Sequence, residues 1–156
     1  MARSDASLQA GRNTRPLDEN EIQRVISLFY NLEREANVRY DATSRTVFRV
    51  IPAGDPNHEI VFGPDIFPGN AVADPNAILS TKCAAAHELS HKARHDDLTE
   101  IDEPELEDID EAMTSLTAIL RFQGDLSNHE VRQLISDAIQ RLALFVAGHR
   151  ARVTEN

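Results

Sequence analysis

Hydrophobic residues near the N-terminus recur at the spacing of an amphipathic helix. The series follows Asp18 and Glu21, which form a D-x-x-E capping box, and it consists of Ile22, Val25, Ile26, Phe29 and Leu32. Residues three and four apart lie on one face of a helix. The pattern therefore predicts a helix over about 18–36, preceded by a polar segment, residues 1–16, that we expect to be flexible.

The hydrophobic pattern then changes to that of short β-strands. The run Thr46–Ile51 is rich in β-branched and aromatic residues, and Glu59–Phe62 is a second such run. A turn cluster that contains proline and glycine separates the two runs, and a loop rich in glycine and proline follows the second one. These features predict two strands in the first half of the chain.

Three further helices are predicted in the second half of the chain. An Asp-Pro pair, typical of an N-cap followed by proline at the first helical position, opens a helix over about 74–95. Another proline opens a helix over about 104–123, which a glycine ends. Ser127 and Glu130 form a capping box before the last helix, and Gly148 is predicted to end it. This order of elements predicts an α+β fold.

Length and composition indicate one globular domain. The chain has 156 residues, of which 41% are hydrophobic and 27% are charged. We expect a single domain over residues 17–152. Cys83 is the only cysteine, which excludes an internal disulfide and a cysteine-rich zinc site. We expect Cys83 to be a small buried residue.

The net charge of −10 comes from one part of the chain. Ten of the 26 acidic residues lie between Asp96 and Glu111, where there is no lysine or arginine, and the other 16 are matched by 16 basic residues. This stretch is a solvated loop, a surface that attracts a basic substrate, or the holder of a structural cation. The acidic balance argues against nucleic acid as a partner.

No part of the sequence has the character of a membrane or signal segment. No apolar run approaches the roughly 18 residues that a membrane span needs, so we expect no membrane span. The N-terminal residues lack the apolar region of a Sec signal peptide. We therefore expect a protein that is cytoplasmic or is exported without a Sec signal peptide.

The candidate chemistry lies at His87 to His91, which read His-Glu-Leu-Ser-His, an H-E-x-x-H motif within the helix predicted over 74–95. Positions i and i+4 project from the same face of a helix, so both imidazoles can reach one zinc ion at about 2.0–2.1 Å. Glu88 lies roughly 100° further around the helix. From there it can take a proton from water at the metal rather than bind the metal. The motif predicts a zinc site with Glu88 as general base.

A catalytic zinc takes three protein ligands and leaves one position open, so a third ligand is needed. Asp97 would serve if the motif continued as H-E-x-x-H-x-x-G, but Arg94 stands where that pattern needs glycine. His95 lies one turn further along, where a straight helix carries it away from the metal, so a supporting role suits it better. The third candidate is Glu111 on the next predicted helix, with Glu107 one turn earlier as its alternative.

An H-E-x-x-H motif followed 20 residues later by a helical glutamate resembles the gluzincins, the thermolysin-like zinc metallopeptidases. The resemblance implies a minimal zincin-like fold, one zinc ion per chain held by His87, His91 and Glu111, and hydrolysis of a peptide bond in a protein or peptide substrate. In that family an aspartate that supports a histidine ligand commonly follows four residues after the glutamate, and here that position is Ser115. With His95 after it, the motif also resembles small ImmA-like peptidases, and its core is similar to that of small secreted effector metallopeptidases of bacterial pathogens.

The resemblance implies further roles. The run Glu59–Phe62 is either an edge strand that pairs with an extended substrate or a buried hairpin strand. The candidates for a donor that stabilises the oxyanion are Tyr30, Tyr40, His129 and His149. The predicted function is a zinc metallopeptidase, and the alternative is a non-catalytic zincin-like protein-binding module with a structural zinc. Ser115 favours that alternative, and Glu88 argues against it, because a structural site needs no base.

Overall fold

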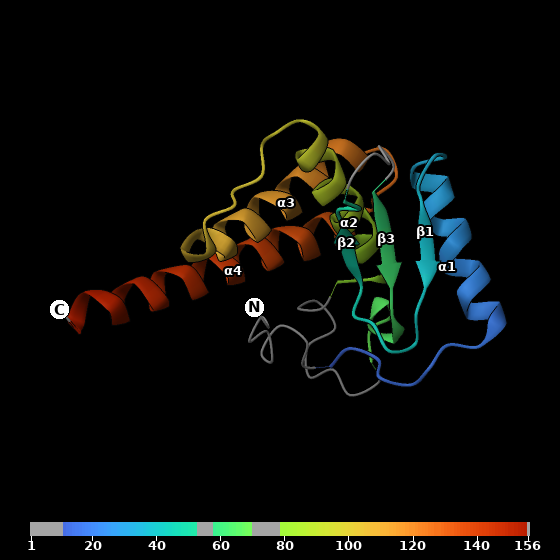
Figure 1. The fold of residues 1–156 in the computed structure, drawn as a ribbon, viewed down its shortest axis with the longest axis horizontal. Helices are drawn as coiled ribbons and strands as arrows, with labels where there is room; N and C mark the ends of the chain where they lie inside the picture. The colour runs from blue at the N-terminus through green and yellow to red at the C-terminus, as the bar shows by residue number, and fades with distance from the viewer. Residues whose placement is uncertain (1–10, 53–57, 70–78, 156) are drawn as a thin grey trace.

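The computed structural model describes residues 11–52, 58–69 and 79–155 of the chain (Figure 1). Helices and a small sheet make up these residues. Their bounds are α1 Glu19–Leu32, β1 Val38–Tyr40, β2 Val47–Arg49, β3 Glu59–Phe62, α2 Thr81–Asp96, α3 Glu107–Phe122 and α4 Asn128–Thr154, with 3-10 turns at Pro64–Ile66 and Pro104–Leu106. The predicted α+β fold is confirmed.

Helix starts follow the signals in the sequence. The Asp18 side chain accepts a hydrogen bond from the backbone N–H of Glu21, and the Ser127 side chain accepts one from that of Glu130. Both predicted capping boxes are therefore present, and each satisfies backbone donors that the first turn leaves unpaired. Pro104 opens a 3-10 turn that leads directly into α3.

Three helix ends differ from the prediction. The helix α1 ends at Leu32, where Glu33 is extended and the chain turns before β1. The helix α2 begins at Thr81 with Ser80 as its N-cap, and the Asp-Pro pair that we expected to open it lies outside the described residues. The prediction that Gly148 ends the last helix is wrong, because α4 continues to Thr154. No helix in the described ranges is both long and apolar enough to cross a membrane.

The sheet has three strands in the order β1-β3-β2. The central strand β3 runs parallel to β1 and antiparallel to β2. The strand β1 is missing from the sequence-based prediction, since its three residues are too few for a visible alternation. The interpretation of Glu59–Phe62 as an edge strand is wrong, because both of its edges are paired and Ile60 to Phe62 are at most 1% exposed. The buried-strand alternative is correct, and β2 is the edge strand beside α2.

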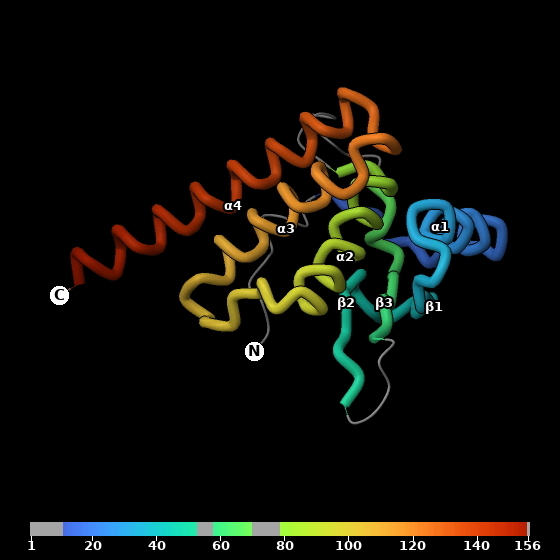
Figure 2. The backbone as a smooth tube through the Cα atoms, turned by 90° about the horizontal axis from the view of Figure 1, so that it is seen from above, coloured from blue at the N-terminus to red at the C-terminus, as the bar shows by residue number. Residues whose placement is uncertain are grey.

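The central helix is α2. Figure 2 shows α1 and α2 on the same side of the three strands, with α3 and α4 on the far side of α2. The small residues Cys83, Ala85 and Ala86 on α2 are fully buried, so neighbouring elements approach it closely. Burial raises the pKa of the Cys83 thiol to about 11, which fits the expected small buried residue. The core extends from α1 to α4 through Phe29, Phe62, Leu89 and Leu134.

The segment before α1 is held against the rest of the described structure. The Arg12 guanidinium donates hydrogen bonds to three backbone carbonyls, those of Asp65, Ile66 and Leu79. Burial lowers the pKa of Arg12 to about 10. The backbone N–H of Leu17 donates to the Tyr40 hydroxyl. Residues 11–16 of the segment that we expected to be flexible are thus anchored, and residues 1–10 lie outside the described residues.

Candidate metal centre

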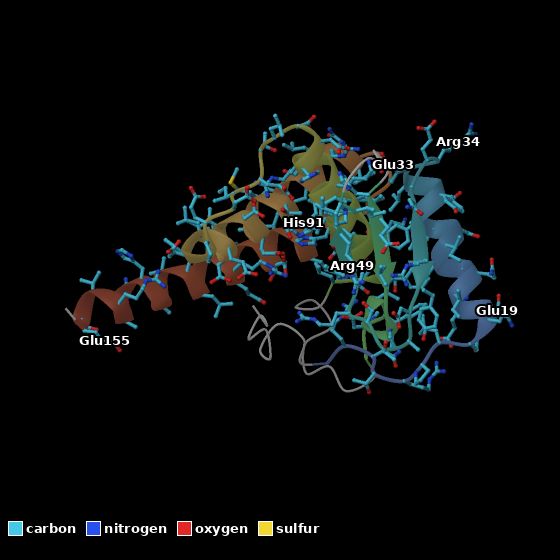
Figure 3. The ribbon with its side chains drawn as sticks, in the orientation of Figure 1. Glu19, Glu33, Arg34, Arg49, His91 and Glu155 are labelled. Carbon is cyan, nitrogen blue, oxygen red and sulfur yellow. The ribbon has the colours of Figure 1, made fainter. Side chains whose placement is uncertain are left out.

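The two histidines of the motif project from one face of α2 toward α3, and Figure 3 shows His91 in the interior between α3 and β2. The ring centroids of His87 and His91 are 4.7 Å apart, as expected for successive turns. The ligand atoms of His87, Glu88 and His91 all lie within 4.8 Å of one another. The described part of α2 therefore brings the three functional positions of the motif together.

Glu111 reaches both histidines from α3. Its Oε2 atom lies 3.0 Å from His87 Nε2 and 3.3 Å from His91 Nε2, and the residue is 3% exposed. Burial alone would raise the pKa of Glu111, but the neighbouring histidines hold it well below its usual range. Burial alone would lower the pKa of His91, and the Glu111 carboxylate raises it instead. The three residues predicted as metal ligands converge on one buried point.

The other candidates for the third ligand make different contacts. Asp97 is exposed at the C-cap of α2. His95 Nδ1 pairs with Glu100 Oε2 at 2.7 Å, away from the motif. Glu107 lies one turn before Glu111 and lines a neighbouring cavity. Among the four candidates, Glu111 is the one whose carboxylate contacts both imidazoles.

Arg94, which replaces the glycine of the extended motif, holds the acidic stretch against α2. Its buried guanidinium lies 2.7 Å from Asp110 Oδ1 and donates to Thr114 Oγ1 at 2.7 Å and to the Thr99 carbonyl at 2.6 Å. These contacts fix the first turns of α3, and therefore Glu111, beside the motif. Most of the acidic stretch from residue 96 to 106 is exposed, but the side chains of Asp110 and Glu111 face partners in the interior.

Glu88 faces β2 rather than α3. Its Oε2 atom accepts a hydrogen bond from the backbone N–H of Phe48 at 2.9 Å. Burial raises the pKa of Glu88 above its ordinary value. A raised pKa suits a carboxylate that has to take up a proton and release it again.

A cavity of about 460 Å³ lies between β2 and the segment that follows α2. Glu88 and His91 line it, together with residues of β2 and its flanks, namely Thr46, Val47, Phe48 and Val50. The opposite side carries five carboxylates, those of Glu100, Asp102, Glu103, Glu107 and Asp110. The cavity is thus lined by the motif, by the outer strand β2 and by a row of acidic side chains.

His87 is also held at its other ring nitrogen. His87 Nδ1 lies 2.9 Å from Ser115 Oγ, and the Ser115 hydroxyl donates to Asp137 Oδ2 at 2.5 Å. Arg141 donates from Nε to the same Asp137 oxygen at 3.0 Å, and its NH1 lies 3.2 Å from Glu111 Oε2. Sequence reasoning missed Asp137 and Arg141. The feature of the sequence that could have indicated them is an aspartate and an arginine four residues apart among the apolar positions of the last helix.

The sequence offers four candidate oxyanion donors, Tyr30, Tyr40, His129 and His149. None of them lines this cavity. The Tyr40 hydroxyl accepts a hydrogen bond from the backbone N–H of Leu17, just before α1. The His149 ring stacks on Phe145 toward the C-terminal end of α4. No contact found among the described residues connects any of the four with the motif.

Comparisons with protein-family models, with curated proteins and with solved structures give no match to this chain. The geometry around His87, Glu88, His91 and Glu111 therefore carries the functional interpretation. That geometry consists of two imidazoles and one carboxylate at a single point, with a second carboxylate beside a cavity.

Proposed function

We propose that the chain is a zinc-dependent metallopeptidase that hydrolyses a peptide bond in a protein or peptide substrate. The observation that carries the proposal is the contact of Glu111 Oε2 with the Nε2 atoms of both His87 and His91. Two imidazole nitrogens and one carboxylate are a donor set of catalytic zinc sites, which hold one ion and leave a position open. His87, His91 and Glu111 would hold this ion.

The hydrogen bonds around His87 favour a cation at this point. Ser115 has one hydroxyl proton and donates it to Asp137, so the Ser115 oxygen accepts the proton of His87 Nδ1. A neutral His87 then has a lone pair on Nε2, which faces Glu111 Oε2 at 3.0 Å. Two facing acceptors repel each other unless a cation lies between them. A proton or a metal ion meets this need, and the donor set suits zinc.

Zinc bound here supplies a Lewis acid that polarises a carbonyl and lowers the pKa of water. Glu88, which the Phe48 N–H holds beside the cavity, takes a proton from the attacking water and passes it to the leaving amine. The outer edge of β2 orients an extended peptide through main-chain groups other than the Phe48 N–H, which donates to Glu88. This role falls to β2 because β3 is paired on both edges.

Metal content and hydrolysis together test the proposal. Protein purified without added metal and without a histidine tag is expected to carry about one zinc per chain and to cleave members of a peptide library. A chelator should abolish cleavage, and added zinc should restore it. Zinc without any cleavage would favour the alternative, a non-catalytic zincin-like module with a structural zinc. A chain that holds no zinc even after loading would contradict both functions.

The carboxylates of the cavity predict a preference for basic substrates. Asp102 and Glu103 are exposed there, whereas Asp110 and Glu100 contact Arg94 and a histidine. Peptides with lysine or arginine beside the scissile bond should be cleaved with a kcat/KM about 10-fold or more above that of matched peptides with glutamate, through faster association. The advantage should shrink as salt is raised, because screening shortens the range of the attraction.

The control for this preference is a change of charge on the cavity wall. The double variant Asp102→Asn/Glu103→Gln should lose much of the preference. Glu105→Gln, an exposed position that does not line the cavity, should keep it. Equal rates on the basic and acidic peptides with the wild-type chain would show that the cavity carboxylates do not select the substrate.

A further inference from the structure

Residues of α3 and α4 connect the two helices that carry the proposed ligands. Ser115 Oγ lies 2.9 Å from His87 Nδ1 and donates to Asp137 Oδ2 at 2.5 Å. Arg141 donates to the same Asp137 oxygen at 3.0 Å and lies 3.2 Å from Glu111 Oε2. Ser115 is fully buried, and Asp137 is 8% exposed. Little water therefore competes for these contacts.

The available donors fix the direction of each hydrogen bond. Asp137 Oδ2 faces two donors, the Ser115 hydroxyl and the Arg141 Nε–H, so this oxygen accepts from both. The Ser115 proton points at Asp137, and its oxygen can only accept from His87 Nδ1–H. The Asp137 charge thus reaches the imidazole through one hydroxyl. This arrangement selects the His87 tautomer whose Nε2 lone pair is open toward Glu111 and His91.

We propose that Asp137 is a positioning residue for the metal centre. Through Ser115 it holds His87 with the proton on Nδ1 and the Nε2 lone pair directed at the ion, and through Arg141 it ties His87 to Glu111. The inference rests on the proposed zinc site. A carboxylate that supports the outer nitrogen of a ligating histidine sets the tautomer and ring orientation and raises the basicity of the ligand.

The supporting carboxylate, Asp137, lies on α4 and not on a helix that carries a proposed ligand. Ser115 on α3 carries no charge of its own, and the negative charge behind His87 comes from Asp137 on α4. The centre then depends on three helices, because α2 gives the histidines, α3 gives Glu111, and α4 gives the support. Metal affinity should therefore respond to a change on α4 that touches no ligand of the ion.

Zinc affinity of the full chain tests the inference. Asp137→Asn keeps an oxygen that can accept from the Ser115 hydroxyl and from Arg141 Nε–H, but it removes the negative charge that makes His87 a more basic ligand. The Kd for zinc, measured by competition with a chromophoric chelator, should rise about 10–100-fold. Ser115→Ala should weaken zinc binding as well. The double variant should bind zinc no more weakly than the single variants, because both changes act on one relay, the hydrogen bonds that run from Asp137 through Ser115 to His87.

Asp125→Asn is the matched control, because Asp125 is an exposed aspartate in the connection between α3 and α4. It makes the same change of charge away from the relay. Its zinc affinity should equal that of the wild type, and circular dichroism should show that all variants keep the fold. A Kd for folded Asp137→Asn that equals the wild-type value would overturn the positioning role while leaving the zinc site in place.

A measurement on the wild-type chain does not depend on any variant. Nitrogen NMR of the zinc-loaded protein should show His87 bound to zinc through Nε2, with its proton on Nδ1. Coordination through Nδ1 would overturn the positioning role, because that nitrogen would then be unable to donate to Ser115. A wild-type chain that binds no zinc would contradict the proposed function itself, and the positioning role with it.

Discussion

Replacing Glu88 by glutamine is expected to stop peptide hydrolysis without removing zinc. The amide has nearly the size of the carboxylate, and its carbonyl oxygen can accept from the Phe48 N–H as Glu88 Oε2 does at 2.9 Å. An amide cannot take a proton from water at neutral pH, so the general-base contribution, typically about 10²–10⁴-fold in rate, is lost. Glu88 contributes no proposed ligand atom, and the zinc content should stay at the wild-type value.

The measurement is kcat/KM on a peptide substrate together with zinc content, both on the same preparations. Glu105→Gln makes the same substitution at an exposed position in the 3-10 turn before α3, and it should change neither quantity. The amide keeps the size of the side chain and can keep the hydrogen bond from the Phe48 N–H, so the Tm should stay close to the wild-type value. Hydrolysis at the wild-type rate would contradict the assigned role, and loss of zinc would place Glu88 among the ligands.

Local signals predicted where helices begin, because a capping box acts within one turn. Asp18 with Glu21 and Ser127 with Glu130 both form as expected. The same kind of signal failed at Gly148. A glycine ends a helix where the chain needs a left-handed conformation, and the glycine with positive φ among the described residues is Gly11. Gly148 keeps the helical conformation, at a cost of about 1 kcal/mol relative to alanine.

The pairing of strands was beyond the reach of local patterns. The composition of Glu59–Phe62 predicted a strand correctly, but its place in the sheet depends on partners far along the chain. Val38 pairs with Ile60 from one side and Phe48 pairs with it from the other. The short strand β1 gains its structure from this pairing, so the three residues alone carry no signal.

In the candidate site too, contacts within one helix are predictable from the sequence, and contacts between helices are not. His87 and His91 share a helix face by their spacing alone, so the sequence predicts their proximity. The contact of Glu111 with both histidines required knowledge of how α3 packs on α2, which the family resemblance supplied as an expectation. Neither the spacing along one helix nor the family resemblance indicated Asp137 and Arg141. Their contacts join α4 to residues on two other helices, and a salt-bridged pair on a helix face is more often a surface feature.

Glu111→Gln is expected to remove most of the zinc, and Glu107→Gln is expected to keep it. The Glu111 carboxylate contacts both imidazoles at 3.0 and 3.3 Å, whereas Glu107 lines the neighbouring cavity one turn earlier on α3. Glutamine preserves the size of the side chain but removes the charge that attracts the ion. The loss of a supporting partner costs typically about 10–100-fold in metal affinity, and the loss of a ligand should exceed that.

The pair of variants separates a ligand from a residue of the cavity wall. After dialysis against a weak chelator, zinc content should fall well below that of the wild type in Glu111→Gln and stay unchanged in Glu107→Gln. The second variant should instead weaken the preference for basic peptides, because it removes a carboxylate from the cavity. The reverse pattern would move the third ligand one turn along α3 and keep the enzyme. Zinc retained in both variants would exclude both α3 glutamates as the third ligand and would leave Glu88, whose carboxylate lies within 4.8 Å of the ligand atoms of both histidines, as the next candidate.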